Sequence, residues 1–157
     1  MSARLDCNKV APDLMRAVFT AAMPLTKSTL GEQLLEFVKL RASQINGCAF
    51  CLDLHARTLL DLSVDFAKIN LVAAWREAPD FDARERAALA WTEALTALGN
   101  HRDNDEAYKE IEAVFSERER VELTHAIGII NMYNRYNVAF RAPPMGMSVS
   151  QLMKMVS

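Results

Sequence analysis

Residues 35–55 read LEFVKLRASQINGCAFCLDLH, and the fold class follows from this stretch and its surroundings. It contains no strand-like alternation of apolar and polar residues, which favours helix over sheet. The pair Asn46–Gly47 interrupts it, as such pairs commonly do between two elements. The stretch therefore predicts two consecutive helices, one ending near Ile45 and one running from Cys48 to about Leu62.

Start and stop signals extend the helical pattern along the rest of the chain. The helix that ends near Ile45 is predicted to begin at Ser28 or Thr29. Further helices are predicted at 12–22 (opened by Pro12), 65–78 (opened by Asp65), 82–99 (Asp82 with Glu85), from Asp103 with Glu106, at 116–140 (Ser116 with Glu119), and in a short tail from Ser148. Together they predict an all-α protein, a single compact helical domain of about six to eight helices over residues 1–157.

The composition of the chain excludes several classes of protein. Hydrophobic residues make up 51% of it, with only 5 Gly and 5 Pro, which indicates a packed globular fold rather than disorder. The net charge is -2 with both signs interspersed, so no nucleic-acid surface is indicated. No apolar run approaches the roughly 18 residues of a membrane-spanning helix, and no signal peptide is recognisable. We expect a soluble, cytoplasmic protein with no nucleic-acid or membrane partner.

The helix predicted after Gly47 carries three side chains capable of redox chemistry. Cys48 and Cys51 are three residues apart and His55 follows four residues later, so all three project from one helix face. With Asn46 as N-cap, both cysteines lie near the helix start, where unsatisfied backbone N–H groups stabilise a thiolate. His55 can take the thiol proton. The pattern predicts a nucleophile, a resolving thiol and a base within two turns.

Glu36 adds a candidate proton-transfer group on the preceding helix. Between Leu34 and Leu40 the only other polar residue is Lys39, so we expect the Glu36 carboxyl to be buried. A buried, unpaired carboxyl would hold its proton more tightly than usual, and it could join a proton relay if the two helices pack side by side. The alternative is an ion pair with Lys39 or Arg41, although neither is at ideal spacing.

The same residues allow plainer interpretations. A Cys-x-x-Cys pair is also half of a structural zinc site, but His55 would be only a third ligand, and we expect no metal. Cysteine is also common as a small buried hydrophobic residue. The remaining candidate ligands have no suitable spacing to the pair: Cys7, His101 and His125. Three polar residues of the long C-terminal helix are interpreted first as packing and hydrogen-bonding groups, and second as lining of the active site: Asn134, Arg135 and Asn137.

The stretch 35–55 closely resembles the core of the alkylhydroperoxidase D-like (AhpD-like) family, which belongs to the carboxymuconolactone decarboxylase superfamily. The family motif is a glutamate twelve residues before a Cys-x-x-Cys and a histidine four residues after the second cysteine. The residues at those positions are Glu36, Cys48, Cys51 and His55. Further matching segments lie within roughly residues 25–141, at 74–77, 85–89 and 134–139.

This resemblance implies an all-helical fold, assembly into a homotrimer or homohexamer, and peroxidase activity through the dithiol. It assigns the attack on peroxide to Cys51 and the resolution of the oxidised sulfur to Cys48. Proton transfer would fall to His55 and Glu36. Phe50 stands where the mycobacterial-type enzyme has an additional histidine, so the relay would be shorter. Family decarboxylases lack the paired cysteines, which disfavours decarboxylase activity.

Two functional hypotheses follow from these residues. The first is a thiol-dependent peroxidase that reduces hydroperoxides through a dithiol/disulfide cycle in antioxidant defence. Because the sequence has no Gly-rich phosphate loop, we expect no cofactor, and electrons would come from a separate thiol or dithiol such as a lipoylated or thioredoxin-like protein. The second is a non-catalytic redox-sensing or disulfide-exchange module, in which the same cysteine pair switches assembly.

Overall fold

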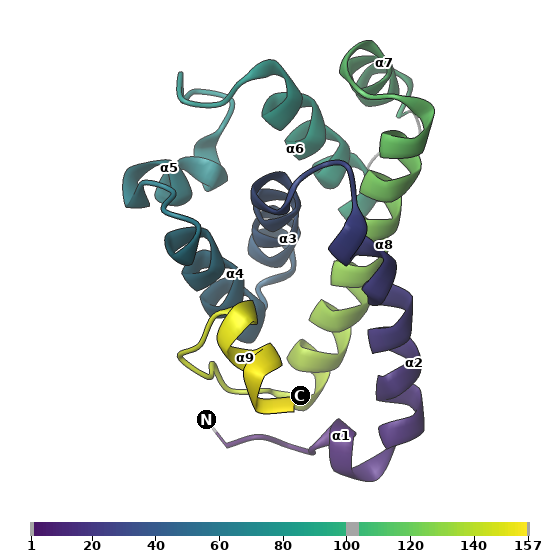
Figure 1. The fold of residues 1–157 in the computed structure, drawn as a ribbon, viewed down its shortest axis with the longest axis vertical. Helices are drawn as coiled ribbons and strands as arrows, with labels where there is room; N and C mark the ends of the chain where they lie inside the picture. Colours follow the sequence, from purple (N-terminus) through teal and green to yellow (C-terminus); the bar gives the residue numbers. More distant parts are fainter. Residues whose placement is uncertain (1, 100–103, 157) are drawn as a thin grey trace.

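The computed structural model describes residues 2–99 and 104–156, and these contain helices but no strand (Figure 1). In chain order the elements are α1 (Cys7–Val10), α2 (Pro12–Ala22), the 3-10 helix η1 (Met23–Lys27), α3 (Glu32–Asn46), α4 (Ala49–Asp61), α5 (Phe66–Leu71), the 3-10 helix η2 (Val72–Ala74), α6 (Ala83–Thr96), α7 (Asp105–Val114), α8 (Glu117–Phe140) and α9 (Val149–Val156). The predicted all-α class is confirmed. The described residues hold nine α-helices, one above the expected range, because the four-residue α1, capped by Asp6, is not among the predicted helices.

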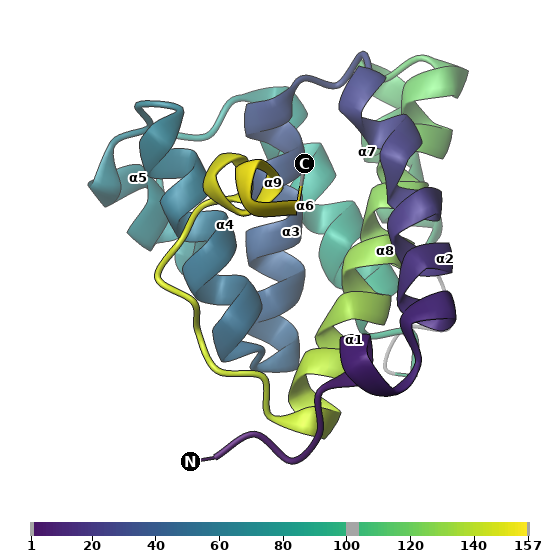
Figure 2. The ribbon, with the colours of Figure 1, turned by 60° about the horizontal axis from the view of Figure 1, so that its bottom comes forward.

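Helix α3 lies at the centre of the molecule, against α4 on one side and against α6 and α8 on the others (Figures 1 and 2). Phe37 of α3 belongs to an apolar cluster with Leu59 of α4 and Leu89 of α6. Val38, the next residue, belongs to a second cluster with residues of α6, α7 and α8, among them Leu123. A helix enclosed in this way buries its polar side chains as well, and this is why α3 can hold a carboxylate inside the protein.

The start of α3 differs from the sequence prediction. The helix begins at Glu32, and Gly31 is its N-cap with a φ of 82°, a conformation that favours glycine. The hydroxyl residues predicted to open the helix bind elsewhere, since Ser28 Oγ donates to Glu122 Oε2 at 2.7 Å and the Thr29 N–H donates to the same oxygen at 3.1 Å. Ser28 and Thr29 therefore tie the segment before α3 to α8, and neither of them caps α3.

The single helix predicted at 65–78 is also shorter in the structure. Its predicted N-cap, Asp65, is confirmed, but α5 ends at Leu71, and it is followed by η2 and then by a turn at 75–77. The Arg86 guanidinium donates to the carbonyls of Ala78 and, at 3.0 Å, of Phe81. These carbonyls are bound by a side chain and not by helical N–H groups, so the chain forms a loop there.

The other predicted boundaries agree more closely. Helix α2 has the predicted bounds and α8 ends at Phe140 as predicted, while α6 ends at Thr96, before the expected stop at Gly99. The start predicted at Asp103 lies outside the described residues, and α7 begins at Asp105. The predicted C-terminal tail forms α9, which packs on α4. Within the described ranges, no helix has the length and apolarity needed to cross a membrane.

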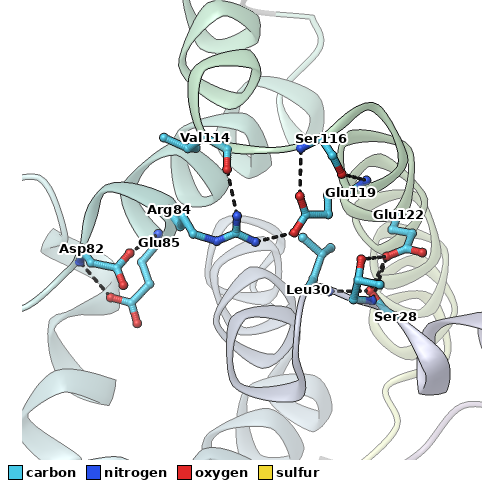
Figure 3. A network of polar contacts seen from close by, with 10 residues as sticks. Ser28, Leu30, Asp82, Arg84, Glu85, Val114, Ser116, Glu119 and Glu122 are labelled. Atoms are coloured by element: carbon cyan, nitrogen blue, oxygen red, sulfur yellow. Dashed lines mark hydrogen bonds and ion pairs between the residues drawn. The ribbon is translucent and has the colours of Figure 1, made fainter.

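Two capping boxes fix the starts of α6 and α8, as the sequence predicts. Asp82 and Glu85 each accept the other's backbone N–H, and Ser116 and Glu119 do the same at the start of α8 (Figure 3). Arg84 joins the two boxes, because its guanidinium donates to Glu119 Oε1 at 2.6 Å and to the Val114 carbonyl at 2.8 Å. The start of α6 is thereby tied to the turn between α7 and α8.

Replacing Ser116 by alanine is expected to lower the free energy of unfolding by about 1 kcal/mol, because the N–H of residue 119 loses its acceptor. Urea unfolding at neutral pH measures the change. Ser2→Ala, in the exposed N-terminal segment, is the matched control and should leave the unfolding midpoint unchanged. Equal midpoints for the two variants would show that the capping box does not stabilise the fold.

Candidate active site

The turn between α3 and α4 places the two cysteines at the start of α4. Asn46 is the last residue of α3, and Gly47 ends that helix with a φ of 65°. Cys48, not Asn46, is the N-cap of α4, and the Cys51 N–H donates to its Sγ at 3.3 Å. The predicted N-cap is therefore wrong. Both cysteines nevertheless lie at the positive end of the helix dipole, which stabilises a thiolate.

Both thiols are free and buried, with exposed fractions of 1% for Cys48 and 2% for Cys51. They form a small cluster with Ala42 and Ile130, and the partly buried Phe50 and Tyr133 pack against it. Two surface pockets lie elsewhere, one at the starts of α3 and α6 and one between α7 and α8, and neither is lined by the cysteines. Both sulfurs are thus almost fully withdrawn from solvent in this chain.

The pairing of α3 with α4 brings His55 and Glu36 together, as the sequence reasoning required. His55 Nδ1 lies 2.6 Å from Glu36 Oε2, and the two side chains are 5% and 1% exposed. Lys39 Nζ donates to the other carboxylate oxygen, also at 2.6 Å. Of the two alternative ion pairs, the one with Lys39 is present, whereas Arg41 binds Glu93.

Glu36 is paired, so the tighter hold on its proton expected of an unpaired carboxyl does not apply. Burial alone would raise the pKa of the Glu36 carboxyl, but the charge and hydrogen bond of His55, followed by those of Lys39, outweigh it and lower the pKa to about 2. Glu36 is thus a permanent anion near neutral pH. An anion fixed at Nδ1 leaves Nε2 of the His55 ring as the nitrogen that can exchange a proton with another group.

The two thiols have opposite proton affinities. The hydrogen bond between them keeps the proton on Cys48, and this contact, burial and the charge of Cys51 raise the Cys48 pKa far above its ordinary value. The same bond lowers the pKa of Cys51 to about 6, against the effect of burial and with help from Asn137, Asn134 and the charge of His55. At neutral pH the pair therefore holds one proton, and Cys51 carries the negative charge.

A further contact comes from a residue for which active-site lining was only the second interpretation of the sequence. Asn137 of α8 donates from Nδ2 to Cys51 Sγ at 3.2 Å across 86 residues of sequence. Asn134, one turn earlier, is fully buried, with hydrogen bonds to Asn46 and Ser43. The spacing of the two asparagines places them on one face of α8, but nothing in the sequence shows that this face meets the cysteines.

The candidate ligands of the zinc alternative do not converge on the pair. His125 Nε2 donates to the Ala21 carbonyl at 2.7 Å, and Cys7 lies in the N-terminal α1. His101 lies outside the described residues. Across 2–99 and 104–156, no group of three His, Cys, Asp or Glu side chains is arranged to hold a metal ion.

Known proteins share this fold and much of this sequence. YdfG of Bacillus subtilis (strain 168), an uncharacterised protein, is 31% identical over 139 residues, covering 88% of this chain and 95% of its own. A crystal structure from Agrobacterium tumefaciens, of unknown function and suggested to be the antioxidant defence protein AhpD, is 37% identical with a TM-score of 0.88, covering 91% of this chain and 98% of that one.

A third similarity concerns the fold alone. The alkylhydroperoxidase AhpD core of an uncharacterised peroxidase-related protein from Ralstonia eutropha JMP134 is 21% identical with a TM-score of 0.72, covering 87% of this chain and 73% of that one. The family model named Carboxymuconolactone decarboxylase family matches residues 12–94, which include Glu36, both cysteines of α4 and His55. The chain therefore belongs to the carboxymuconolactone decarboxylase family, with an AhpD-like fold.

Proposed function

We propose that this protein is a thiol-dependent peroxidase that reduces hydroperoxides through a Cys48–Cys51 dithiol/disulfide cycle. The observation that carries the proposal is the placement of two free thiols in the first turn of α4, where Cys51 Sγ accepts from Asn137 Nδ2 at 3.2 Å. Cys51 has a pKa lowered to about 6, while its neighbour Cys48, in hydrogen-bond contact, keeps its proton. A reactive thiolate beside a protonated resolving thiol is the arrangement that two-step reduction of a peroxide requires.

His55 and Glu36 supply the proton transfer in this proposal. The carboxylate of Glu36 binds Nδ1 of His55 and fixes the ring, so that Nε2 handles the proton. Cys51 lies one helical turn before His55, and the charge of His55 contributes to lowering the Cys51 pKa. With Phe50 at the position of the additional family histidine, His55 is the base of the relay.

The reaction proceeds in two balanced steps. The Cys51 thiolate attacks the terminal oxygen of the hydroperoxide, the O–O bond breaks, and the alkoxide leaves as an alcohol after taking a proton from protonated His55. Cys51 is then a sulfenic acid. Cys48 attacks its sulfur, the S–O bond breaks and water leaves, which forms the Cys48–Cys51 disulfide.

A separate thiol or dithiol must return two electrons to this disulfide. A lipoylated or thioredoxin-like protein has the required chemistry, and a reducing compartment such as the cytoplasm keeps it reduced. We also propose a homotrimer or homohexamer as the assembled form, in line with the family resemblance. The similarity to the Agrobacterium tumefaciens protein supports an antioxidant role for the cycle.

A single-turnover experiment tests this proposal. One equivalent of cumene hydroperoxide added to the reduced chain is expected to consume two of its three thiols and to give one intramolecular disulfide that peptide mapping assigns to Cys48 and Cys51. Cys7→Ser is the matched control, and it should lose both remaining thiols. Consumption of peroxide without loss of the Cys48 and Cys51 thiols would contradict the proposal, and so would oxidation of Cys7 alone.

The same assay separates the enzyme from a redox sensor built on the same cysteine pair. With excess dithiothreitol and hydroperoxide, an enzyme consumes many equivalents of peroxide per chain. A sensor reacts once and changes its assembly, which size-exclusion chromatography of the reduced and oxidised protein detects.

A further inference from the structure

The two buried sulfurs have different hydrogen-bond donors. Cys48 Sγ accepts the backbone N–H of Cys51 at 3.3 Å, within the first turn of α4. Cys51 Sγ accepts the side-chain amide of Asn137 at 3.2 Å, from the far end of the chain. A backbone donor cannot be exchanged without changing the helix, whereas a side-chain donor can be lost in one substitution. The second contact is therefore a separable part of the site.

The helix that carries this amide is held firmly against α3. Asn134, one turn before Asn137, accepts from Asn46 Nδ2 at 2.9 Å and donates to Ser43 Oγ at 3.0 Å, which fixes both ends of its own amide. The Asn137 carbonyl accepts the Ala142 N–H at 2.9 Å, where α8 ends. Contacts on both sides of Asn137 thus fix the backbone of α8 from which its side chain reaches the sulfur.

The burial of Cys51 makes this donor important. A sulfur that is 2% exposed has almost no water to stabilise its negative charge, so each N–H directed at it has a larger effect than at the surface. The titratable groups around it are Cys48 and His55 on α4, Glu36 and Lys39 behind His55 on α3, and Tyr133 of α8, which packs on the same cluster. Asn137 is a neutral donor among them that contacts the sulfur directly.

We propose that the Asn137 side-chain amide acts together with the Cys48 thiol to favour Cys51 as the reactive thiolate, and that the amide holds the same sulfur when it leaves during reduction of the disulfide. This inference rests on the dithiol cycle proposed above. In the reductive step the thiolate of the donor attacks Cys48 Sγ, the S–S bond breaks, and its electron pair passes to Cys51 Sγ. The thiol with the lower pKa is the better leaving group, so the amide that favours the Cys51 thiolate favours this direction of attack.

The test measures thiolate formation without peroxide, so it can fail independently of the peroxidase activity. Full-length reduced protein is alkylated with iodoacetamide over a range of pH, and mass spectrometry gives the rate at each cysteine. Asn137→Ala is expected to raise the midpoint of the Cys51 profile by about one pH unit, because the thiolate loses a donor. Asn137→Asp, which is isosteric, should raise it further by placing a like charge at the sulfur.

The control makes the same chemical change far from the site. Asn70→Asp, on the exposed side of α5, should leave the Cys51 midpoint unchanged. Circular dichroism confirms the fold of each variant, and the isosteric Asp variant remains informative if the Ala variant does not fold. Midpoints for both Asn137 variants equal to that of the wild type would overturn the proposal, whether or not the protein consumes peroxide.

Discussion

Cys51→Ser is expected to abolish hydroperoxide turnover, with a loss of roughly 10³-fold or more relative to the wild type. A serine hydroxyl at this position is not ionised at neutral pH, whereas the Cys51 thiol, with its pKa lowered to about 6, is largely thiolate there. The N–H of Asn137 and the base His55 remain in place in the variant, so the loss reports on the sulfur itself. Steady-state consumption of cumene hydroperoxide with dithiothreitol measures it.

Cys48→Ser is the matched variant for this experiment, since it removes the neighbouring sulfur of the same pair. It should still react with one equivalent of peroxide and accumulate a sulfenic acid at Cys51, which dimedone traps, but it cannot form the disulfide. Turnover retained in Cys51→Ser and lost in Cys48→Ser would reverse the assigned roles of the two cysteines.

Glu36→Gln is expected to lower kcat/KM for the hydroperoxide by about 10²-fold. The substitution keeps the size of the side chain but removes the anion that binds His55 Nδ1 at 2.6 Å. The imidazole then loses the charge that orients it. Because protonated His55 supplies the proton to the leaving alkoxide, the second half of peroxide cleavage becomes slower.

Glu85→Gln provides the control for burial and for the loss of a lysine ion pair. Glu85 is 6% exposed and binds Lys68 at 2.8 Å, much as Glu36 binds Lys39, but it lies at the start of α6. This variant should be less stable than the wild type with normal kcat/KM. A similar loss of activity in both variants would indicate that Glu36 contributes to stability alone.

The parts of the site that sequence predicts are the parts fixed by local spacing. Cys48, Cys51 and His55 lie at one helix, so the helical repeat alone places them on one face, and in the structure all three are buried. The capping boxes at Asp82 and Ser116 are likewise local, because each is complete within four residues. The meeting of Glu36 with His55 needed one additional assumption, that consecutive helices pack side by side.

The parts that sequence does not predict depend on contacts between distant segments. The direction of the Glu36 pKa shift depends on whether burial or its partners dominate, and that balance is visible only when the distances to His55 and Lys39 are known. The role of Asn137 depends on the packing of α8 against the start of α4, across 86 residues of chain. The N-cap of α4 was misassigned because Asn46 has a stronger propensity for that position than Cys48, but its side chain is bound by α8.

The ionisation of Cys51 is the most direct test of the whole account. Thiolate absorbance at 240 nm, taken as the difference between the wild type and Cys51→Ser, gives the pKa of this thiol in the folded protein. Because the pKa is lowered, the thiolate should appear as the pH rises through about 6 and be complete before the ordinary value of 9.0. A difference signal that appears only near 9.0 would contradict the assignment of Cys51 as the activated sulfur.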